Sequence, residues 1–210
     1  MTGTLLIVAG LAVLAGLFWL ANGVRQIGAV SSGVPIGQRS GTALLLIDLQ
    51  AVFWDEGPYA GAAKADAKAA ILAEVSAARA EAMPVIALRQ EWSIPSTRLI
   101  ARLLMKGQAL SGTPGTALAA PFAGLADHVL VKRVQDSFET GELDALLEKL
   151  DIGRLRIVGL DMNYCVAKTA LAARLRGYAV EIVTAATLAA NPAATARTCA
   201  ALAEHGVALR

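Results

Sequence analysis

The chain has 210 residues, enough for one α/β domain with a sizeable core, and its formal net charge at pH 7 is +2. Its basic residues are scattered and form no stripe, so the charge pattern gives no support for nucleic-acid binding. Two cysteines, Cys165 and Cys199, are too few for a disulfide framework in a chain of this length. We therefore expect one folded domain without a nucleic-acid partner.

The first apolar run covers residues 5–21 and reads LLIVAGLAVLAGLFWLA, without a charge or a strongly polar side chain. A bilayer crossing needs about 17–25 such residues, and Trp19 near one end is typical of an interfacial anchor. A buried core helix is disfavoured because the run is apolar on every face. A cleaved signal peptide is disfavoured because MTGT lacks Lys and Arg and LANG is a poor cleavage site. The sequence favours a transmembrane anchor over residues 1–24.

The residues after this run predict an orientation. No Lys or Arg precedes the run, whereas Arg25 and Arg39 follow it, and an excess of basic residues marks the cytoplasmic side. Residues 25–40 are rich in Gly and Ser and include Pro35, as in a linker. We therefore expect a single-pass, membrane-anchored protein with its folded domain, residues 41–210, in the cytoplasm.

Beyond the linker, apolar runs typical of buried strands alternate with segments of helical periodicity. The expected strands are residues 42–47, 84–90, 127–133, 154–160, 180–183 and 207–209, and the expected helices are 63–83, 96–106, 142–150, 166–176 and 192–204. This alternation predicts a parallel sheet covered by helices on both faces, in one domain.

Three residues with reactive side chains fall at one edge of this sheet. Asp48 follows the first strand, Lys132 lies near the end of the third, and Cys165 lies where the loop after the fourth becomes a helix. Each has an ordinary alternative: a turn carboxylate, a solvated lysine and a small buried apolar residue. Together they supply a nucleophile, a carboxylate that accepts and returns a proton, and a cation that stabilises both anions. That combination is suited to hydrolysis.

The position of Cys165 adds to this interpretation. The partial positive charge at a helix N-terminus lowers a thiol pKa, and the free N–H groups of the first turn can bind an oxyanion. An inert, buried cysteine is the competing explanation. Cys199 lies in an Ala-rich segment with helical character, so we expect it only to pack.

Four stretches between residues 43 and 187 resemble, in order and spacing, the isochorismatase-like cysteine hydrolase superfamily, of the nicotinamidase and N-carbamoylsarcosine amidase type. They read ALLLIDLQAVF, GTPGTAL, DHVLVKRVQDSFETGELDALL and RIVGLDMNYCVAKTALAARLRGYAVEIVTAAT. Residues 54–111 match only in their strand and helix pattern. The resemblance implies an α/β fold of the Rossmann-like, three-layer α/β/α kind around a six-stranded parallel sheet. It also implies a catalytic triad of Asp48, Lys132 and Cys165.

The resemblance carries two further expectations about the residues before the nucleophile. It implies a cis peptide bond between Leu160 and Asp161, which costs about 3 kcal/mol and persists only where a site requires it. It also implies an oxyanion hole formed by the backbone N–H groups of Asp161 and Cys165.

Metal binding is where the chain departs from part of this superfamily. Nicotinamidases often bind a metal through an Asp and several His after the second strand, but residues 89–106 contain no His. His128 lies inside an expected strand, where a lone histidine is usually structural. We therefore expect neither a metal nor another cofactor.

The expected activity is hydrolysis of an amide, carbamoyl or related C–N bond of a small-molecule substrate through a thioester on Cys165. Isochorismatases proper cleave a vinyl ether without the cysteine, so Cys165 favours the amidase-type branch. The alternatives are a membrane-tethered, non-catalytic binding module and an ether hydrolase, and a homo-oligomer is left open. The residues expected around the substrate are Phe53, Trp92 and Phe138 as lining and Gln50 and Arg89 as polar contacts.

Overall fold

The computed structural model describes residues 2–210, so Met1 of the expected anchor lies outside it. The helices are α1 (Thr2–Ile27), α2 (Ala51–Trp54), α3 (Gly61–Ala80), α4 (Pro95–Leu104), α5 (Glu142–Lys149), α6 (Ala167–Leu175) and α7 (Pro192–Glu204). The strands are β1 (Gly41–Ile47), β2 (Val85–Gln90), β3 (His128–Lys132), β4 (Ile152–Leu160), β5 (Ala179–Leu188) and β6 (Ala208–Leu209). A short 3₁₀ helix (Ala120–Phe122) precedes β3, and a π-helical turn (Met162–Val166) precedes α6.

All six strands form one parallel sheet in the order β3-β2-β1-β4-β5-β6, which confirms the predicted fold class. The chain builds outward in one direction from β1 to β3 and in the other from β4 to β6. The direction reverses between β1 and β4, and in such sheets the ligand site lies at this switch point, beyond the carboxyl ends of the strands.

A glycine at the switch point allows β1 and β4 to approach each other closely. Gly159 of β4 pairs with Ile47 of β1 and has φ of +118°, a conformation that residues with a Cβ rarely adopt. A Cβ at Gly159 would also collide with the backbone oxygen of Ile47. The carboxyl ends of β1 and β4 can therefore lie side by side with the loops that follow them.

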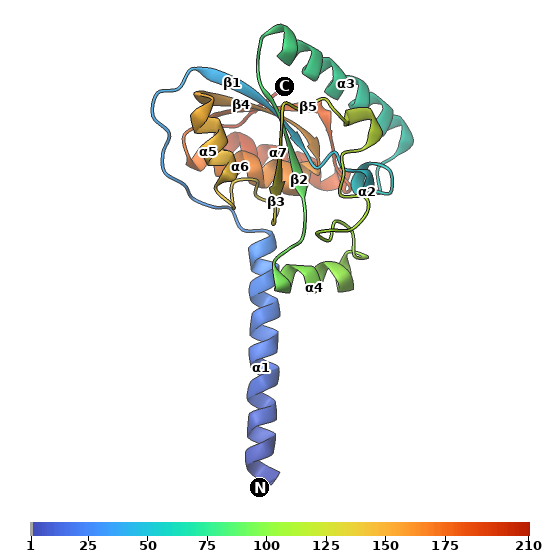
Figure 1. Cartoon of the computed structure of the whole chain (residues 1–210), viewed down its shortest axis with the longest axis vertical. Coiled ribbons are helices and arrows are strands. Elements are labelled where there is room, and N and C mark those ends of the chain that lie inside the picture. The colour runs from blue at the N-terminus through green and yellow to red at the C-terminus, as the bar shows by residue number, and fades with distance from the viewer. Residues whose placement is uncertain (1) are drawn as a thin grey trace.

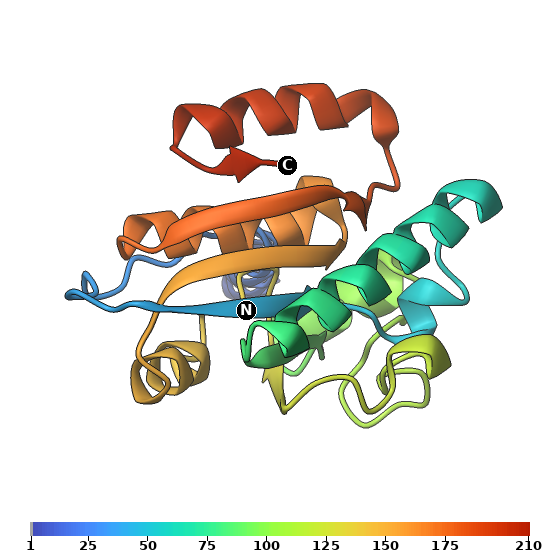
Figure 2. The same ribbon diagram turned by 90° about the horizontal axis from the view of Figure 1, so that it is seen from above.

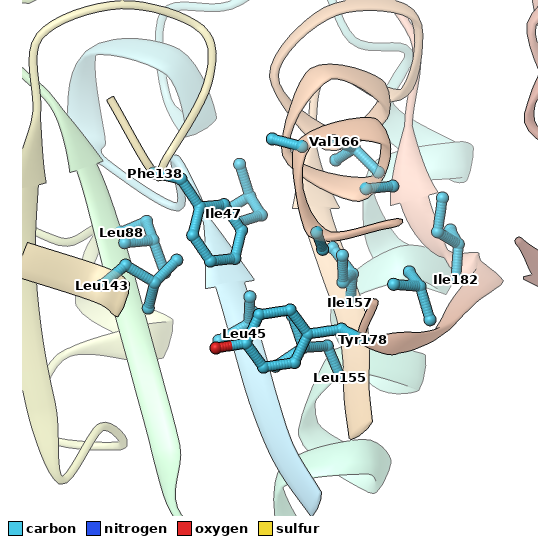
Figure 3. Packing of buried hydrophobic residues seen from close by; sticks show 14 of the residues in the cluster. Leu45, Ile47, Leu88, Phe138, Leu143, Leu155, Ile157, Val166, Tyr178 and Ile182 are labelled. Atoms are coloured by element: carbon cyan, nitrogen blue, oxygen red, sulfur yellow. The ribbon is translucent and has the colours of Figure 1, made fainter. Parts of the chain in front are cut away.

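Strand β1 is buried on both faces, and its side chains alternate between two cores. Leu45 and Ile47 pack with residues of α5 and α6, whereas Leu44 and Leu46 pack with residues of α3. Figure 2 shows α3 in front of the sheet and α6 behind it, and Figure 3 shows the core on the α6 side. The two helical layers hold the sheet, so its carboxyl edge is a firm support for a site.

Helix α3 shows how the sequence dictates one of these layers. Its sequence, GAAKADAKAAILAEVSAARA, is rich in alanine, the residue with the highest helix propensity. Its buried apolar residues recur at the spacing of one helical face and are Ala67, Ile71, Val75 and Ala78.

Helix α1 extends away from the domain (Figure 1). Its segment Leu6–Ile27 has a mean hydropathy of 2.0, and only 6% of the apolar window in it is buried. A largely exposed apolar helix is not a core helix, which removes that alternative. A membrane anchor and a signal sequence both fit its length and composition.

The end of α1 is docked on the domain. A Cβ at Gly23 would lie 2.7 Å from the Cβ of Ser96 in α4, so a residue without a side chain lets the two helices approach closely. Ile27 is buried, and its carbonyl oxygen accepts a hydrogen bond from the backbone N–H of Gln135 at 3.1 Å. The helix is longer than the expected apolar run and includes the first residues of the expected linker.

The remaining residues of the expected linker lie along the domain surface. The backbone N–H of Ser31 donates to Asp136 Oδ2 at 2.7 Å, and the Arg176 guanidinium donates to the carbonyl oxygen of Ser31 at 2.8 Å. Farther along, the N–H of Ile36 donates to the carbonyl oxygen of Arg176 at 2.8 Å. These bonds fix where the chain passes between α1 and β1.

Candidate active site

The structure brings the three expected catalytic side chains together at the carboxyl edge of the sheet. Asp48 directly follows β1, Lys132 is the last residue of β3, and Cys165 lies in the π-helical turn after β4. The Nζ atom of Lys132 lies 3.0 Å from Asp48 Oδ2 and 3.3 Å from Cys165 Sγ. One ammonium group therefore bridges the carboxylate and the thiol.

The backbone at Asp48 turns sharply as β1 ends. Asp48 has φ of +53°, in the left-handed region, and its N–H donates to the carbonyl oxygen of Leu88 at 2.9 Å. This conformation costs roughly 1–2 kcal/mol for an L-residue, and aspartate is among the residues that adopt it most readily. The turn leaves the carboxylate facing Lys132, with Oδ2 bound and Oδ1 without a hydrogen-bond partner among the described residues.

Lys132 is almost completely buried and has several acceptors around its ammonium group. Besides Asp48 and Cys165, its Nζ donates to Gln90 Oε1 at 2.6 Å and to the carbonyl oxygen of Val134 at 3.3 Å. A buried ammonium is costly unless it is paired and hydrogen-bonded. These contacts hold the lysine charged and fixed in position.

Burial and charge set the protonation of the site. Burial raises the pKa of the Asp48 carboxyl, although Lys132 opposes the rise. Burial also raises the pKa of the Cys165 thiol, and the Asp48 carboxylate raises it further, while Lys132 opposes both. For Lys132, burial lowers the pKa, but the attraction of Asp48 and Cys165 outweighs it and leaves the pKa raised.

These directions correct the expected behaviour of Cys165. We expected a helix N-terminus to lower the pKa of the thiol, but its surroundings raise it. The physical reason is that burial and a neighbouring carboxylate both disfavour a thiolate. These surroundings favour the neutral thiol, so the thiolate forms as its proton passes to a base.

A cavity of about 350 Å³ lies above these groups. Its lining combines aromatic and apolar walls with a polar floor and consists of Asp48, Phe53, Tyr59, Gln90, Trp92, Met105, Gln135, Leu160, Asp161, Tyr164 and Cys165. A second hollow of about 400 Å³ lies at the opposite, amino-terminal edge of the sheet, and its lining contains neither cysteine nor histidine. The 350 Å³ cavity thus joins space for a ligand to a nucleophile.

Phe53 and Trp92 line this cavity, as expected, but Gln50 does not. The Gln50 amide donates to the carbonyl oxygens of Gln90 at 3.0 Å and Thr116 at 2.9 Å, and its oxygen accepts from the N–H of Gln90 at 2.6 Å. Gln50 is fully buried, so it ties the end of β1 to the end of β2 and has no free polar atom for a substrate.

Arg89 and Phe138 also lie outside the cavity lining. Strand alternation places Arg89 away from its neighbour Gln90, and its guanidinium pairs with Glu91. Phe138 is buried in the core on the α6 side, with its ring centroid 5.8 Å from that of Tyr178 (Figure 3). Its role there is packing.

Sequence reasoning missed two tyrosines of the cavity. Tyr59 comes from the loop between α2 and α3, and Tyr164 is the residue before the cysteine. Burial raises the pKa of Tyr59, and the nearby Asp161 and Cys165 raise it further, so its hydroxyl remains a proton donor. Tyr59 lies in a loop, where the sequence has no periodic pattern that could have indicated it. Tyr164 could have been predicted, because it directly precedes Cys165.

The turn before the nucleophile differs from expectation in one respect. The described residues contain no cis peptide bond, so the expected cis bond between Leu160 and Asp161 is wrong. Asp161 has an extended backbone, and its side chain caps the π-helical turn by accepting the N–H of Asn163 at 2.8 Å. Its other oxygen accepts a hydrogen bond from the N–H of Ala190. With both oxygens bound, the Asp161 side chain holds the turn while its own peptide bond is trans.

The family model described as Isochorismatase domain matches residues 42–210, which is most of the chain. The chain belongs to the isochorismatase family. No curated protein matches the chain in sequence.

Solved structures share the fold of this isochorismatase-family chain. N-carbamoylsarcosine amidase from Thermoplasma acidophilum has a TM-score of 0.69 at 21% identity, covering 81% of this chain and 96% of its own. Pyrazinamidase from Pyrococcus horikoshii in complex with zinc has a TM-score of 0.68 at 20% identity, covering 81% and 99%. An isochorismatase family protein from Desulfovibrio vulgaris has a TM-score of 0.68 at 25% identity, covering 82% and 94%. The family resemblance expected from the sequence motifs is therefore confirmed.

The zinc in one of these structures raises the question whether this family member could hold a metal. Between residues 2 and 210, no three His, Cys, Asp or Glu side chains gather as a metal requires. Glu91, the acidic residue after β2, is engaged by Arg89 and by the Ser111 hydroxyl at 3.0 Å. The residues present do not fit a metal site, and no metal takes part in the chemistry proposed below.

Proposed function

We propose that this protein hydrolyses an amide, carbamoyl or related C–N bond of a small molecule through a thioester on Cys165. The observation that carries the proposal is the Lys132 ammonium, which bridges Asp48 and Cys165 at 3.0 Å and 3.3 Å on the floor of a cavity. A thiol, a basic carboxylate and a fixed cation are the groups that nucleophilic hydrolysis needs.

The first half of the reaction transfers the acyl group to sulfur. Asp48 accepts the Cys165 proton at Oδ1, and its raised pKa favours this transfer. Sγ then bonds to the carbonyl carbon, and the carbonyl electrons move to oxygen, where the N–H groups of Asp161 and Cys165 stabilise the charge. As the C–N bond breaks, Asp48 returns the proton to nitrogen. Ammonia or an amine leaves, and a thioester remains.

The second half releases the acid. Asp48, ionised again, takes a proton from water, and the hydroxyl oxygen bonds to the thioester carbon. Collapse of this intermediate breaks the C–S bond, and the proton on Asp48 returns to sulfur. Lys132 keeps its charge throughout and stabilises whichever neighbour is anionic. The net reaction consumes one water and leaves every side chain as it began.

The cavity indicates the size of the substrate. Ligand pockets range from about 300 to 1,000 Å³, and this one lies near the lower limit at about 350 Å³. Its walls include Phe53, Tyr59, Trp92 and Tyr164, which suit a flat or compact molecule. N-carbamoylsarcosine amidase and pyrazinamidase share the fold, and their names describe amidases.

The test is a panel of small C–N substrates: acetamide, benzamide, nicotinamide, pyrazinamide and N-carbamoylglycine, assayed for ammonia release, and benzohydroxamate, assayed for hydroxylamine release. At least one should be hydrolysed, Cys165→Ala should abolish turnover without unfolding the chain, and Cys199→Ala should retain it. Ether hydrolysis that survives in Cys165→Ala would favour the isochorismatase-type alternative. Binding without turnover of any member would favour the non-catalytic module.

A second part of the proposal concerns location: α1 anchors the enzyme to a membrane with the catalytic domain in the cytoplasm. The apolar face of α1 is exposed, Trp19 lies near its end, and Arg25 follows. A cytoplasmic location would also keep the Cys165 thiol reduced. Full-length protein should stay in the membrane after a carbonate wash, and a C-terminal tag should resist protease added to intact cells. A shortened, exported protein would show instead that the run is a cleaved signal.

A further inference from the structure

Helix α4 exposes large apolar side chains beside basic ones. Leu103 and Leu104 are 69% and 76% exposed, and Leu99 is 37% exposed. Arg102 and, just past the end of the helix, Lys106 are also exposed. The residues of α4 that pack inward are Ser96, Thr97, Ile100 and Ala101, and Leu104, one turn after Ile100, continues their row past the end of the packed surface. Leucines this exposed are costly in water, so the outer face of α4 is suited to a partner.

The position of α4 relative to α1 indicates what that partner is. Figure 1 shows α4 lying crosswise to α1, at the end of the domain from which α1 extends. Gly23 of α1 packs against Ser96 and Ile100 of α4. Ile100 belongs to a buried apolar cluster between α1 and α4, and Leu20 of α1 packs against this cluster. A bilayer core takes up about 20 helical residues at 1.5 Å each, so residues 20–23 would lie at its boundary with water.

The charges on α4 match that boundary. None of Arg98, Arg102 and Lys106 forms an ion pair with the part of the chain that the structure describes. Long basic side chains extend to lipid headgroups while their stems and neighbouring leucines lie among acyl chains. Free positive charges near a bilayer also attract anionic lipids.

We propose that α4 lies in the interface of an anionic membrane and forms a second lipid contact beside α1. The proposal rests on the anchoring role proposed for α1. A lipid surface fits better than a protein partner because α4 packs on α1 at the level where the exposed apolar run of α1 ends, and its exposed leucines lie among basic residues that form no ion pair with the described residues. Trp92 and Met105 belong both to the cluster between α1 and α4 and to the wall of the active-site cavity. The lipid contact and the cavity therefore share a wall.

Spin labels on the full-length chain test this directly. A single label is attached at Leu103→Cys, Val13→Cys or Leu175→Cys in a Cys165→Ala, Cys199→Ala background, with the protein in vesicles of 3:1 phosphatidylcholine and phosphatidylglycerol. Leu175, on α6, is the matched control because it is 56% exposed on another surface. Accessibility to oxygen, which concentrates in lipid, is compared with accessibility to an aqueous nickel chelate.

The label at position 103 should be at least threefold more accessible to oxygen, relative to nickel, than the label at 175. The label at 13 should be deeper still. An aqueous label at 103 with a deep label at 13 would overturn the α4 proposal and leave the anchor intact. Aqueous labels at both would overturn both proposals. A label at 103 shielded from both reagents would show a protein partner there and overturn the lipid proposal.

The basic residues supply a second, independent readout. Replacing Arg98, Arg102 and Lys106 with Gln should bring the label at 103 toward aqueous accessibility on anionic vesicles, as should neutral vesicles with the parent chain. If the cysteine-free background does not fold, hydrogen exchange of the unmodified chain serves instead. Residues 99–106 should then exchange more slowly in anionic vesicles than in a neutral detergent, and equal exchange would contradict the proposal.

Discussion

The side-chain oxygen of Gln90 lies 2.6 Å from the Nζ atom of Lys132, although neither residue is adjacent in sequence to the nucleophile. The amide nitrogen of Gln90 has no partner among the described residues, and Gln90 also lines the cavity. Gln90 therefore positions the lysine that bridges Asp48 and Cys165. Gln90 can do this because it lies at the carboxyl end of β2. From the sequence, we expected the preceding residue, Arg89, at the site instead.

Removing this contact should slow catalysis. A hydrogen bond to a charged group contributes about 1.5–3 kcal/mol, so Gln90→Leu should lower kcat/KM by roughly tenfold to a hundredfold. The measurement is steady-state ammonia release, with the circular dichroism spectrum as a check on folding. Gln108→Leu is the control, since its amide makes only a 3.5 Å contact with the carbonyl oxygen of Val52. Equal losses in both variants would remove the positioning role.

The reactivity of Cys165 should respond in opposite directions to its two charged neighbours. The carboxylate of Asp48 raises the thiol pKa and the ammonium of Lys132 lowers it. Asp48→Asn should therefore speed alkylation by iodoacetamide at pH 8, while abolishing turnover. Lys132→Met should slow alkylation, because the thiolate loses its cation. The rates are read by mass spectrometry of the Cys165 peptide, and a change of the same sign in both variants would contradict this electrostatic account.

Activity should depend on pH through Asp48. Burial raises the pKa of its carboxyl, so the group takes up a proton at a higher pH than an ordinary aspartate does. The protonated carboxyl cannot accept the thiol proton, and kcat/KM should fall as pH decreases through this raised pKa. A profile measured from pH 4 to 9 should show the acid limb above the range of a free aspartate, near 3.9. An acid limb at or below that value would contradict the assignment of the base.

The segment between α1 and β1 should contribute to stability. Deleting residues 1–20 removes most of the apolar run but keeps Ser31, whose N–H binds Asp136 and whose carbonyl oxygen binds Arg176. This variant should be soluble and active. Deleting residues 1–40 removes these bonds to charged groups and should lower the free energy of unfolding by about 1.5–3 kcal/mol more. Thermal and urea unfolding compare the two variants, and equal stability would show that the docked segment is dispensable.

The close approach of β1 and β4 makes a specific prediction for Gly159. An alanine there would have φ of +118° and a Cβ in collision with the backbone of Ile47, so the variant should lose at least about 3 kcal/mol of stability. Gly124→Ala is the matched control because it also has positive φ, +74°, but no atom within 4 Å of the added Cβ. Its cost should be only about 1–2 kcal/mol. Denaturant unfolding measures both, and similar losses would refute the steric argument.

Most of the fold could be predicted because its signals are local and periodic. Buried strands such as β1 are continuous apolar runs, and the helices between them show one apolar face. The meeting of Asp48, Lys132 and Cys165 was predictable for a related reason, because parallel strands bring their carboxyl ends to one edge of the sheet.

The remaining features depend on contacts between distant segments, which local patterns do not contain. Gln50 and Arg89 are polar residues at the correct edge, but hydrogen bonds to Thr116 and Glu91 occupy them. The thiol pKa of Cys165 is governed by burial and by Asp48, not by the helix N-terminus considered from the sequence. The docking of α1 on α4 depends on the fit of Gly23 against a helix far along the chain.

The central claim is that the acyl group of a substrate passes through Cys165. The most direct measurement is mass spectrometry of the protein, quenched in acid during turnover of whichever amide in the panel releases ammonia fastest. The account predicts a mass increase equal to the acyl group, located on the peptide that contains Cys165, and no adduct in Cys165→Ala. Turnover of that amide by Cys165→Ala at an undiminished rate, with no adduct on the unaltered protein, would contradict it.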